Sequence, residues 1–153
     1  MEKLQTQYLG LTLRSPLIVS SSGLTSTPGQ LKEAEDSGAG AVVLKSLFEE
    51  QINAQIHSFP SSHEYPEADD YVSNYIKSNS VDTYLDLIRN AKKNLKIPVI
   101  PSVNCYSAEG WTGFAKKMED AGADALEINV FYLPVDRKRS SAESEKLYFD
   151  LIE

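Results

Sequence analysis

The chain has very little cysteine and no long hydrophobic run. Cys105 is the single cysteine among 153 residues, so no disulfide can form within the chain. No stretch approaches the roughly 18 apolar residues that a membrane-spanning helix needs. The N-terminal residues show no apolar segment followed by a small-residue cleavage site, and we therefore expect a cytoplasmic protein without a membrane partner.

An excess of positive charge is also missing. Fifteen Lys and Arg residues stand against 22 Asp and Glu residues, which gives a formal net charge of −7. Nucleic acids are bound by positively charged faces, so we expect no nucleic acid as a partner. Small molecules remain open as ligands.

Four short apolar runs are bounded by glycine, proline or polar residues, and none alternates cleanly, which is typical of strands buried in a parallel sheet. They are residues 17–21, 41–45, 98–103 and 125–131. Helical patterns separate and follow them at 27–38, 82–95, 108–121 and from Ser141 onward. This alternation predicts parallel strands joined by right-handed crossovers.

One unit of the sequence occurs twice. Residues 31–45 align without gaps on residues 115–129, and each copy has a helix, a glycine that ends it and then a buried strand. The alignment equates Lys45 with Asn129. Both residues fall at the carboxyl end of a strand, where parallel sheets and barrels place their ligands.

Two architectures fit four such units. Length favours a small open sheet, because (β/α)8 barrels need about 250 residues and at least about 200. The apolar helical pattern at the C-terminal end and the predicted hairpin of Leu4–Tyr8 and Leu11–Leu13, which would plug a barrel floor, favour half a barrel. We predict that residues 1–153 are the N-terminal half of an α/β (β/α)8 TIM barrel, with a long active-site loop at 47–80 after the second strand.

Polar residues follow the predicted strands at Ser20–Gly23, Lys45-Ser46, Asn104 and Asn129. A lysine that ends a buried strand is expected to be partly desolvated, and its charge is then useful opposite an electron-rich group. A reduced flavin carries negative charge near N1, and asparagines match the imide and carbonyl edges of its ring. Glycine lets the backbone approach a flat ring closely. The alternative is that these residues are solvated strand ends.

At these positions the sequence resembles the dihydroorotate dehydrogenase family of FMN enzymes, which are built on a (β/α)8 barrel. The residues that carry the resemblance are Tyr8–Pro16, Ser21-Ser22-Gly23, Lys45-Ser46 and Glu127-Ile128-Asn129. The resemblance covers nearly the whole chain but only the first half of a family member. It implies an FMN oxidoreductase of pyrimidine biosynthesis that acts on a CH–CH bond, with FMN bound by Ser22, Gly23, Lys45, Ser46, Asn104 and Asn129, and with Lys45 and Asn129 also facing the substrate.

The sequence departs from the family pattern at two places. Tyr132 stands three residues beyond Asn129, where family members have a cysteine or serine base, and tyrosine is rarely ionised at neutral pH. We predict Lys45 and Tyr132 as catalytic residues, with hydrogen bonding or packing as the other roles open to Tyr132. The family's glycine-containing substrate loop is not recognisable in residues 48–80, so the substrate is either dihydroorotate or a related small molecule.

Further alternatives concern partners and metals. A half barrel lacks the last strands that hold phosphates, so we expect this chain alone to be inactive and to need a C-terminal half-barrel chain or segment, or to form a homodimer. A non-catalytic half-barrel module that pairs with another chain is the second hypothesis. A small open domain with a phosphate site is the third, although no Gly-rich phosphate loop is present. His57 and His63 lack a third, well-spaced ligand, and we predict no metal site.

Overall fold

The computed structural model describes residues 4–48, 66–104, 108–130 and 135–152, without the side chains of 66–79, 108–112, 147 and 151–152. Its strands are β1 (Thr6–Tyr8), β2 (Leu11–Leu13), β3 (Ile18–Val19), β4 (Ala41–Val43), β5 (Leu47–Phe48), β6 (Val99–Ile100), β7 (Ser102–Asn104) and β8 (Glu127–Ile128). Its helices are the short 3-10 helix η2 (Gly23–Thr25) and α1 (Pro28–Asp36), α3 (Pro66–Asn94), α4 (Ala108–Asp120) and α5 (Ser141–Ile152). No helix in these ranges is both long and apolar enough to cross a membrane.

The parallel strands follow one another in sequence order. β3 pairs with β4 and β4 with β6, while β5 pairs with β7 and β7 with β8. Because β5 continues the strand begun by β4 and β7 continues β6, the two ladders are consecutive parts of four neighbouring strands. The four predicted strands are thus confirmed. Their order has no reversal, whereas doubly wound open sheets reverse their strand order at a switch point.

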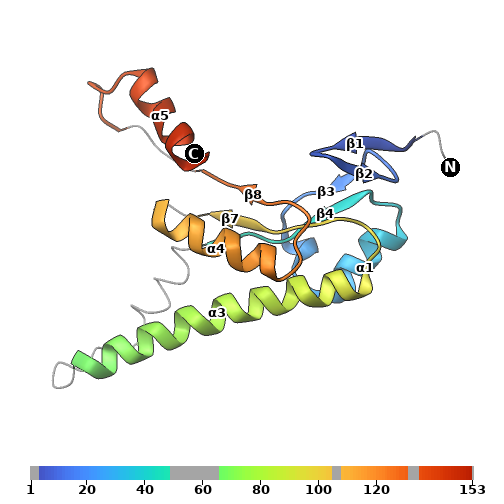
Figure 1. Ribbon diagram of the computed structural model, residues 1–153, viewed down its shortest axis with the longest axis horizontal. Helices are drawn as coiled ribbons and strands as arrows, with labels where there is room; N and C mark the ends of the chain where they lie inside the picture. The colour runs from blue at the N-terminus through green and yellow to red at the C-terminus, as the bar shows by residue number, and fades with distance from the viewer. Residues whose placement is uncertain (1–3, 49–65, 105–107, 131–134, 153) are drawn as a thin grey trace.

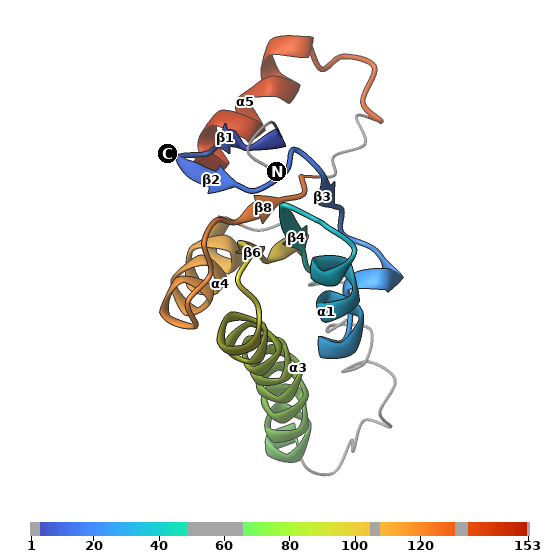
Figure 2. The ribbon, with the colours of Figure 1, turned by 90° about the vertical axis from the view of Figure 1, so that its right-hand side faces the viewer.

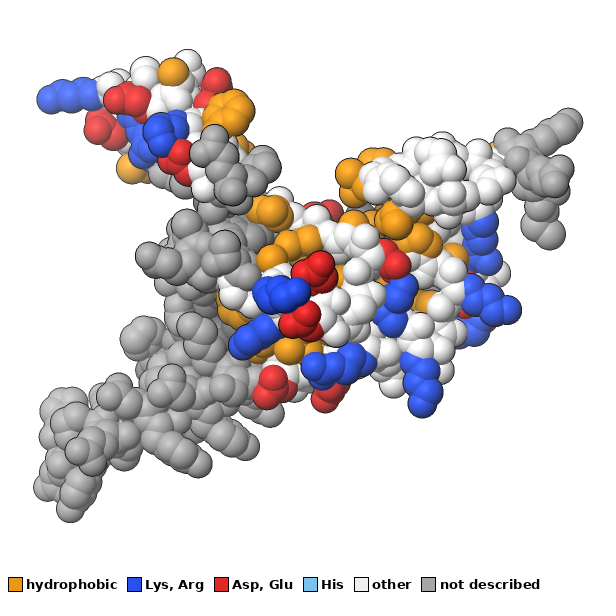
Figure 3. All heavy atoms as spheres, in the orientation of Figure 1, with side chains coloured by type: hydrophobic (Ala, Val, Ile, Leu, Met, Phe, Trp, Pro, Cys, Tyr) orange, Lys and Arg blue, Asp and Glu red, His pale blue; other side chains and the backbone are white. Residues whose placement is uncertain are grey.

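The helices α1, α3 and α4 lie on one side of these strands (Figures 1 and 2). The helical pattern predicted over 82–95 is confirmed, since Leu85, Ile88 and Ala91 of α3 are buried on one side of that helix. These α3 residues share one hydrophobic core with the strand residues that face the helices, namely Val42, Leu44, Val99 and Val103. On the face seen in Figure 3, basic and acidic side chains are interspersed. On α4, the Lys116 ammonium pairs with the Glu119 carboxylate at 3.0 Å.

The other face of the strands packs against the N-terminal hairpin. Leu13 of β2 is buried with Ala41, Val43 and Ile100, and Leu11 packs against this cluster. The hairpin turns at Leu9 and Gly10, whose φ values of 51° and 76° suit a two-residue turn. The predicted hairpin is confirmed, and it covers the beginning of the strands while their carboxyl ends extend beyond it.

Helix α3 begins earlier than the sequence predicts. It starts at Pro66, whereas the sequence predicts a loop over 47–80 and a helix only from Asp82. Residues 66–80 are therefore a correction to that prediction. The stretch is rich in Asp, Ser and Asn, which compete with helix by bonding to nearby backbone, although proline is well placed in the first turn of a helix. Residues 49–65, with His57 and His63, lie outside the described residues.

The repeated unit is confirmed, with one informative difference. Gly38 and Gly122 end α1 and α4 with φ values of 98° and 97°. Two residues later the copies diverge at Gly40 and Asp124. A Cβ on Gly40 would lie 1.9 Å from the carbonyl oxygen of Ser15, so a side chain is excluded there.

Asp124 stands in the second copy where the first copy has Gly40, and its carboxylate bonds to two neighbouring segments of the chain. Asp124 accepts hydrogen bonds from the Val99 amide at 2.7 Å and from the Lys92 ammonium at 2.6 Å. Asp124 therefore ties the start of β8 to β6 and to α3.

Glu35 joins α1 to the end of α3. Its buried carboxylate accepts hydrogen bonds from the Lys96 amide at 2.6 Å and from the Lys32 ammonium at 3.0 Å. Burial alone would raise the pKa of the Glu35 carboxyl, but these hydrogen bonds outweigh it and the pKa is lowered.

Gly40→Ala is expected to destabilise the fold by about 4 kcal/mol or more, because the new methyl group would overlap backbone that cannot move freely. Gly29→Ala is the matched control, since a Cβ at Gly29 meets nothing within 4 Å and alanine favours the helix. Urea unfolding measures both. A Gly40→Ala chain as stable as the parent would contradict the close approach.

Glu35→Gln is expected to make stability less dependent on pH. Because the folded-state pKa of Glu35 is lowered, its contribution is present above the ordinary glutamate pKa of about 4.3 and is lost as the pH falls through the folded value. The difference in free energy of unfolding between parent and variant should shrink between pH 7 and pH 3. Glu119→Gln, on an exposed face of α4, should show no such change, and an equal response of both variants would exclude this role.

Candidate functional site

A cavity of about 470 Å³ lies at the carboxyl ends of the strands. Its size falls within the range of small-molecule sites. The lining residues come from the segments after β3, between β4 and β5, and along β8, and they are Ser20, Ser21, Ser22, Gly23, Lys45, Ser46, Phe48, Glu127 and Asn129. The structure therefore brings together five of the predicted site residues: Ser22, Gly23, Lys45, Ser46 and Asn129.

The structure does not place two predicted site residues at this cavity. Asn104 ends β7, where it pairs with Phe48, and it is not among the described residues that line the cavity. Tyr132, like Cys105, lies outside the described residues, so its predicted catalytic role remains a prediction. In the described ranges, no three His, Cys, Asp or Glu side chains are grouped as metal ligands would be.

A β-bulge places Lys45 and Ser46 at this cavity. Val43 pairs with Ile100 and Leu47 pairs with Val103, so three residues of one strand oppose two of the other. The bulged backbone bonds to the segment after β3 instead. The Lys45 amide donates to the Thr25 carbonyl at 3.1 Å, and the Ser46 amide donates to Ser21 Oγ at 3.0 Å.

A chain of hydrogen bonds crosses the four strands at the bulge. Ser21 Oγ lies 2.9 Å from Ser46 Oγ, and Ser46 Oγ lies 2.7 Å from Ser102 Oγ. The fully buried Ser102 hydroxyl donates to Glu127 Oε1 at 2.7 Å. We name these four side chains the serine–glutamate chain. It joins polar side chains that lie in or next to four successive strands, with Ser102 and Glu127 as the first residues of β7 and β8.

Tyr84 of α3 holds the middle of this chain from the helix layer. Its hydroxyl donates to the Ser102 carbonyl at 3.1 Å and accepts from the Ser102 amide at 3.0 Å. Burial raises the pKa of Tyr84 above its usual range, the charge of Glu127 adds to the rise, and the bond to the Ser102 backbone opposes it. The phenol therefore stays protonated and able to donate.

The sequence did not single out Ser21, Ser102, Glu127 or Tyr84 as site residues. Glu127 carried a usable signal, since it is a charged residue between Leu126 and Ile128 in a run that reads as a buried strand. Ser21 stood among the strand-end residues at 20–23, whereas Ser102 and Tyr84 carried no signal, because serines and tyrosines are common in any strand or helix.

The structure corrects one expectation about Lys45. Its side chain is exposed, not partly desolvated, because the carboxyl ends of the strands are open to solvent on this face.

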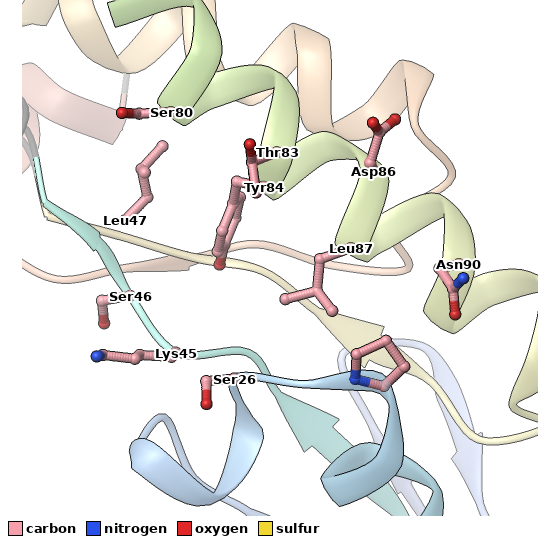
Figure 4. A pocket seen from close by; sticks show the side chains of 11 residues that line it. Ser26, Lys45, Ser46, Leu47, Ser80, Thr83, Tyr84, Asp86, Leu87 and Asn90 are labelled. Carbon is pink, nitrogen blue, oxygen red and sulfur yellow. The ribbon is translucent and has the colours of Figure 1, made fainter. Parts of the chain in front are cut away.

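A second cavity of about 530 Å³, between α3 and the segment Ser26–Pro28, also borders Lys45 and Ser46. Figure 4 shows Leu47, Tyr84 and Leu87 on its wall, with the Lys45 amine pointing away from Leu87.

These features define a parallel α/β protein in which the helices α1, α3 and α4 cover one face of the sheet and a polar cavity lies at the strand ends. No protein family model matches the chain. It is 34% identical over 131 residues to the dihydroorotate dehydrogenase B (NAD(+)) catalytic subunit of Thermoplasma acidophilum, a match of 85% of this chain and 42% of that protein. The subunits of the same name from Thermoplasma volcanium and Methanocella arvoryzae are each 33% identical, over 85% and 79% of this chain and 42% and 38% of their own lengths.

The chain belongs to the dihydroorotate dehydrogenase family, and it matches the N-terminal part of the family members. It spans about two-fifths of the length of the curated relatives.

Tyr84→Phe is expected to lower the free energy of unfolding by about 1–3 kcal/mol, because the buried Ser102 amide loses its acceptor. Tyr148→Phe removes a hydroxyl from an exposed side chain and should change it by less than about 0.5 kcal/mol. Chemical unfolding of both variants measures the difference, and equal stabilities would argue against the Tyr84 anchor.

Proposed function

We propose that the chain is the N-terminal part of an FMN-dependent oxidoreductase on a (β/α)8 barrel, acting on a CH–CH bond of dihydroorotate or a related small molecule. The observation that carries this proposal is the gathering of Lys45, Ser46 and Asn129 with Ser22 and Gly23 around one strand-end cavity. Relatives named dihydroorotate dehydrogenase support the reaction class.

The residues at the cavity fit a flavin ring chemically. Lys45 supplies an ammonium for an electron-rich carbonyl edge, and Asn129 supplies an amide with both donors and an acceptor. The surroundings of Gly23 are open, since a Cβ there would meet nothing within 4 Å, so a flat ring has room against this turn. When bound, FMN would supply the acceptor for a hydride from the substrate.

The proposed role of Ser22 is to shape the cavity. Its hydroxyl accepts from the Leu24 amide at 3.2 Å and its amide donates to Thr25 Oγ1 at 3.2 Å, so its polar groups cap η2. We propose that this cap fixes the Gly23 turn against which the ring lies. Lys45 and Asn129 would orient ring and substrate, Asn104 would reach the ring from β7, and Tyr132 would act in proton transfer.

The remaining parts of such a site would come from another segment or chain. Barrels of this type hold phosphates with the loops after strands seven and eight, beyond the four strands described here. We propose a C-terminal half-barrel segment or partner chain as the source, and we expect this chain alone to be inactive. In the described sheet, β3 and β8 each pair on one side only, which leaves an edge for that partner.

The alternative is a non-catalytic half-barrel module that pairs with another chain. Leu17 beside β3 is 67% exposed and Ile128 in β8 is 39% exposed. Such apolar side chains at the sheet edges favour pairing with another chain, whether or not the assembly is an enzyme. Flavin binding separates the two proposals.

Reconstitution with the C-terminal half of the Thermoplasma acidophilum relative tests the function. The mixture should form a yellow 1:1 complex with added FMN, and dihydroorotate should bleach it without oxygen. Lys45→Ala should slow bleaching by at least about tenfold, since it removes an ionic contact of about 1.4 kcal/mol or more. Lys116→Ala, at an exposed site on α4, is the matched control. A complex that forms but takes up no FMN would favour the non-catalytic module.

A further inference from the structure

The hydrogens of the serine–glutamate chain can be assigned from its geometry. Each serine hydroxyl has one hydrogen to donate and two lone pairs to accept with, whereas a carboxylate only accepts. The Ser102 hydrogen is committed to Glu127 Oε1 at 2.7 Å. The contact of 2.7 Å between Ser102 and Ser46 must therefore use the hydrogen of Ser46.

The hydrogen of Ser21 is fixed in the same way as that of Ser46. The Ser46 hydrogen is committed to Ser102, so the contact of 2.9 Å between Ser46 and Ser21 must use the hydrogen of Ser21. Ser21 Oγ also accepts from the Ser46 amide. Every hydroxyl hydrogen of the chain is thus directed toward Glu127, and the contacts among the described residues leave one lone pair on Ser21 and one on Ser46.

We infer that Glu127 is a positioning residue that orders this chain, so that Ser21 and Ser46 present only hydrogen-bond acceptors to the strand-end cavity. Both serines line that cavity, and Lys45, which lines it too, carries an ammonium that can only donate. The site then selects a ligand edge on which an N–H lies next to a carbonyl or anionic oxygen. The oxygen meets Lys45 and the N–H meets a serine lone pair.

This inference rests on the proposed function, because an isoalloxazine ring has such an edge. In the oxidised ring the only N–H is at N3, between two carbonyl groups. FMN and 3-methyl-FMN therefore form a matched pair of probes that differ in this one donor. Quenching of flavin fluorescence measures their affinities for the chain, alone and with the C-terminal half-barrel used above.

The parent protein should prefer FMN over 3-methyl-FMN by about tenfold, which corresponds to 1.4 kcal/mol. Glu127→Gln should reduce this preference to about twofold or less, because an amide can donate to Ser102 and let the hydroxyls point either way. Ser102→Ala should do the same, since it frees the Ser46 hydrogen. Glu119→Gln, a matched change on exposed α4, should leave the preference intact. Equal weakening of both probes by Glu127→Gln would mean a structural role only and would overturn the inference, as would a parent protein that does not discriminate.

A measurement without ligand separates failure of this inference from failure of the proposed function. In an equal mixture of H₂O and D₂O, a serine hydroxyl that exchanges slowly splits its ¹³Cβ resonance into two lines. Ser46 and Ser102 should show split lines in the parent chain and single lines in Glu127→Gln. Single lines in the parent would overturn the inference even if FMN binds. If neither flavin binds, split lines that depend on Glu127 would still establish the order of the hydroxyls, and only the flavin proposal would fall.

Discussion

One extra residue between β4 and β5 organises the strand-end cavity. The Leu44 amide donates to the Ile100 carbonyl, so in a regular parallel ladder the Ser46 amide would bond to that same neighbouring strand. The bulge turns it instead toward Ser21, on the side where the Lys45 amide donates to Thr25. That exchange draws the first strand's loop onto the second strand and places Ser46 within reach of Ser102. The cavity, the lysine and the hydroxyl contacts all depend on this local mismatch of three residues against two.

The two faces of the sheet have different physical tasks. One face is covered by α1, α3 and α4 and holds the larger apolar core. The opposite face is apolar only near the hairpin, where Leu13 is buried, and becomes polar toward the carboxyl ends of the strands. Tyr84 connects the faces, because it belongs to the helix layer and bonds to the backbone of Ser102. The apolar core that stabilises the fold and the polar residues at the cavity are therefore separate, but the bond between Tyr84 and Ser102 joins them.

Local patterns in the sequence predicted most of the fold. The glycines that end two similar helices and the apolar runs act within a few residues of chain, so their effect can be read without tertiary contacts. The early start of α3 could not be read, since its polar first half lacks an apolar stripe. The gathering of Lys45 and Asn129 followed from the rule that parallel strands end at one edge. The serine–glutamate chain did not, because its contacts join residues 25 and 56 positions apart and require the bulge. The exposure of Lys45 was mispredicted for the same reason: it depends on what covers the strand ends.

The repeated helix–strand unit has a kinetic consequence. Its closing contacts are short in sequence, as between the Ala39 amide and the Ala34 carbonyl or the Ala123 amide and the Met118 carbonyl. Contacts of that kind cost little loop-closure entropy and form early in folding, whereas pairings between distant segments form late. The contacts at the cavity, such as those of Ser46 with Ser21 and Ser102, join residues 25 and 56 positions apart and so carry the larger loop-closure cost.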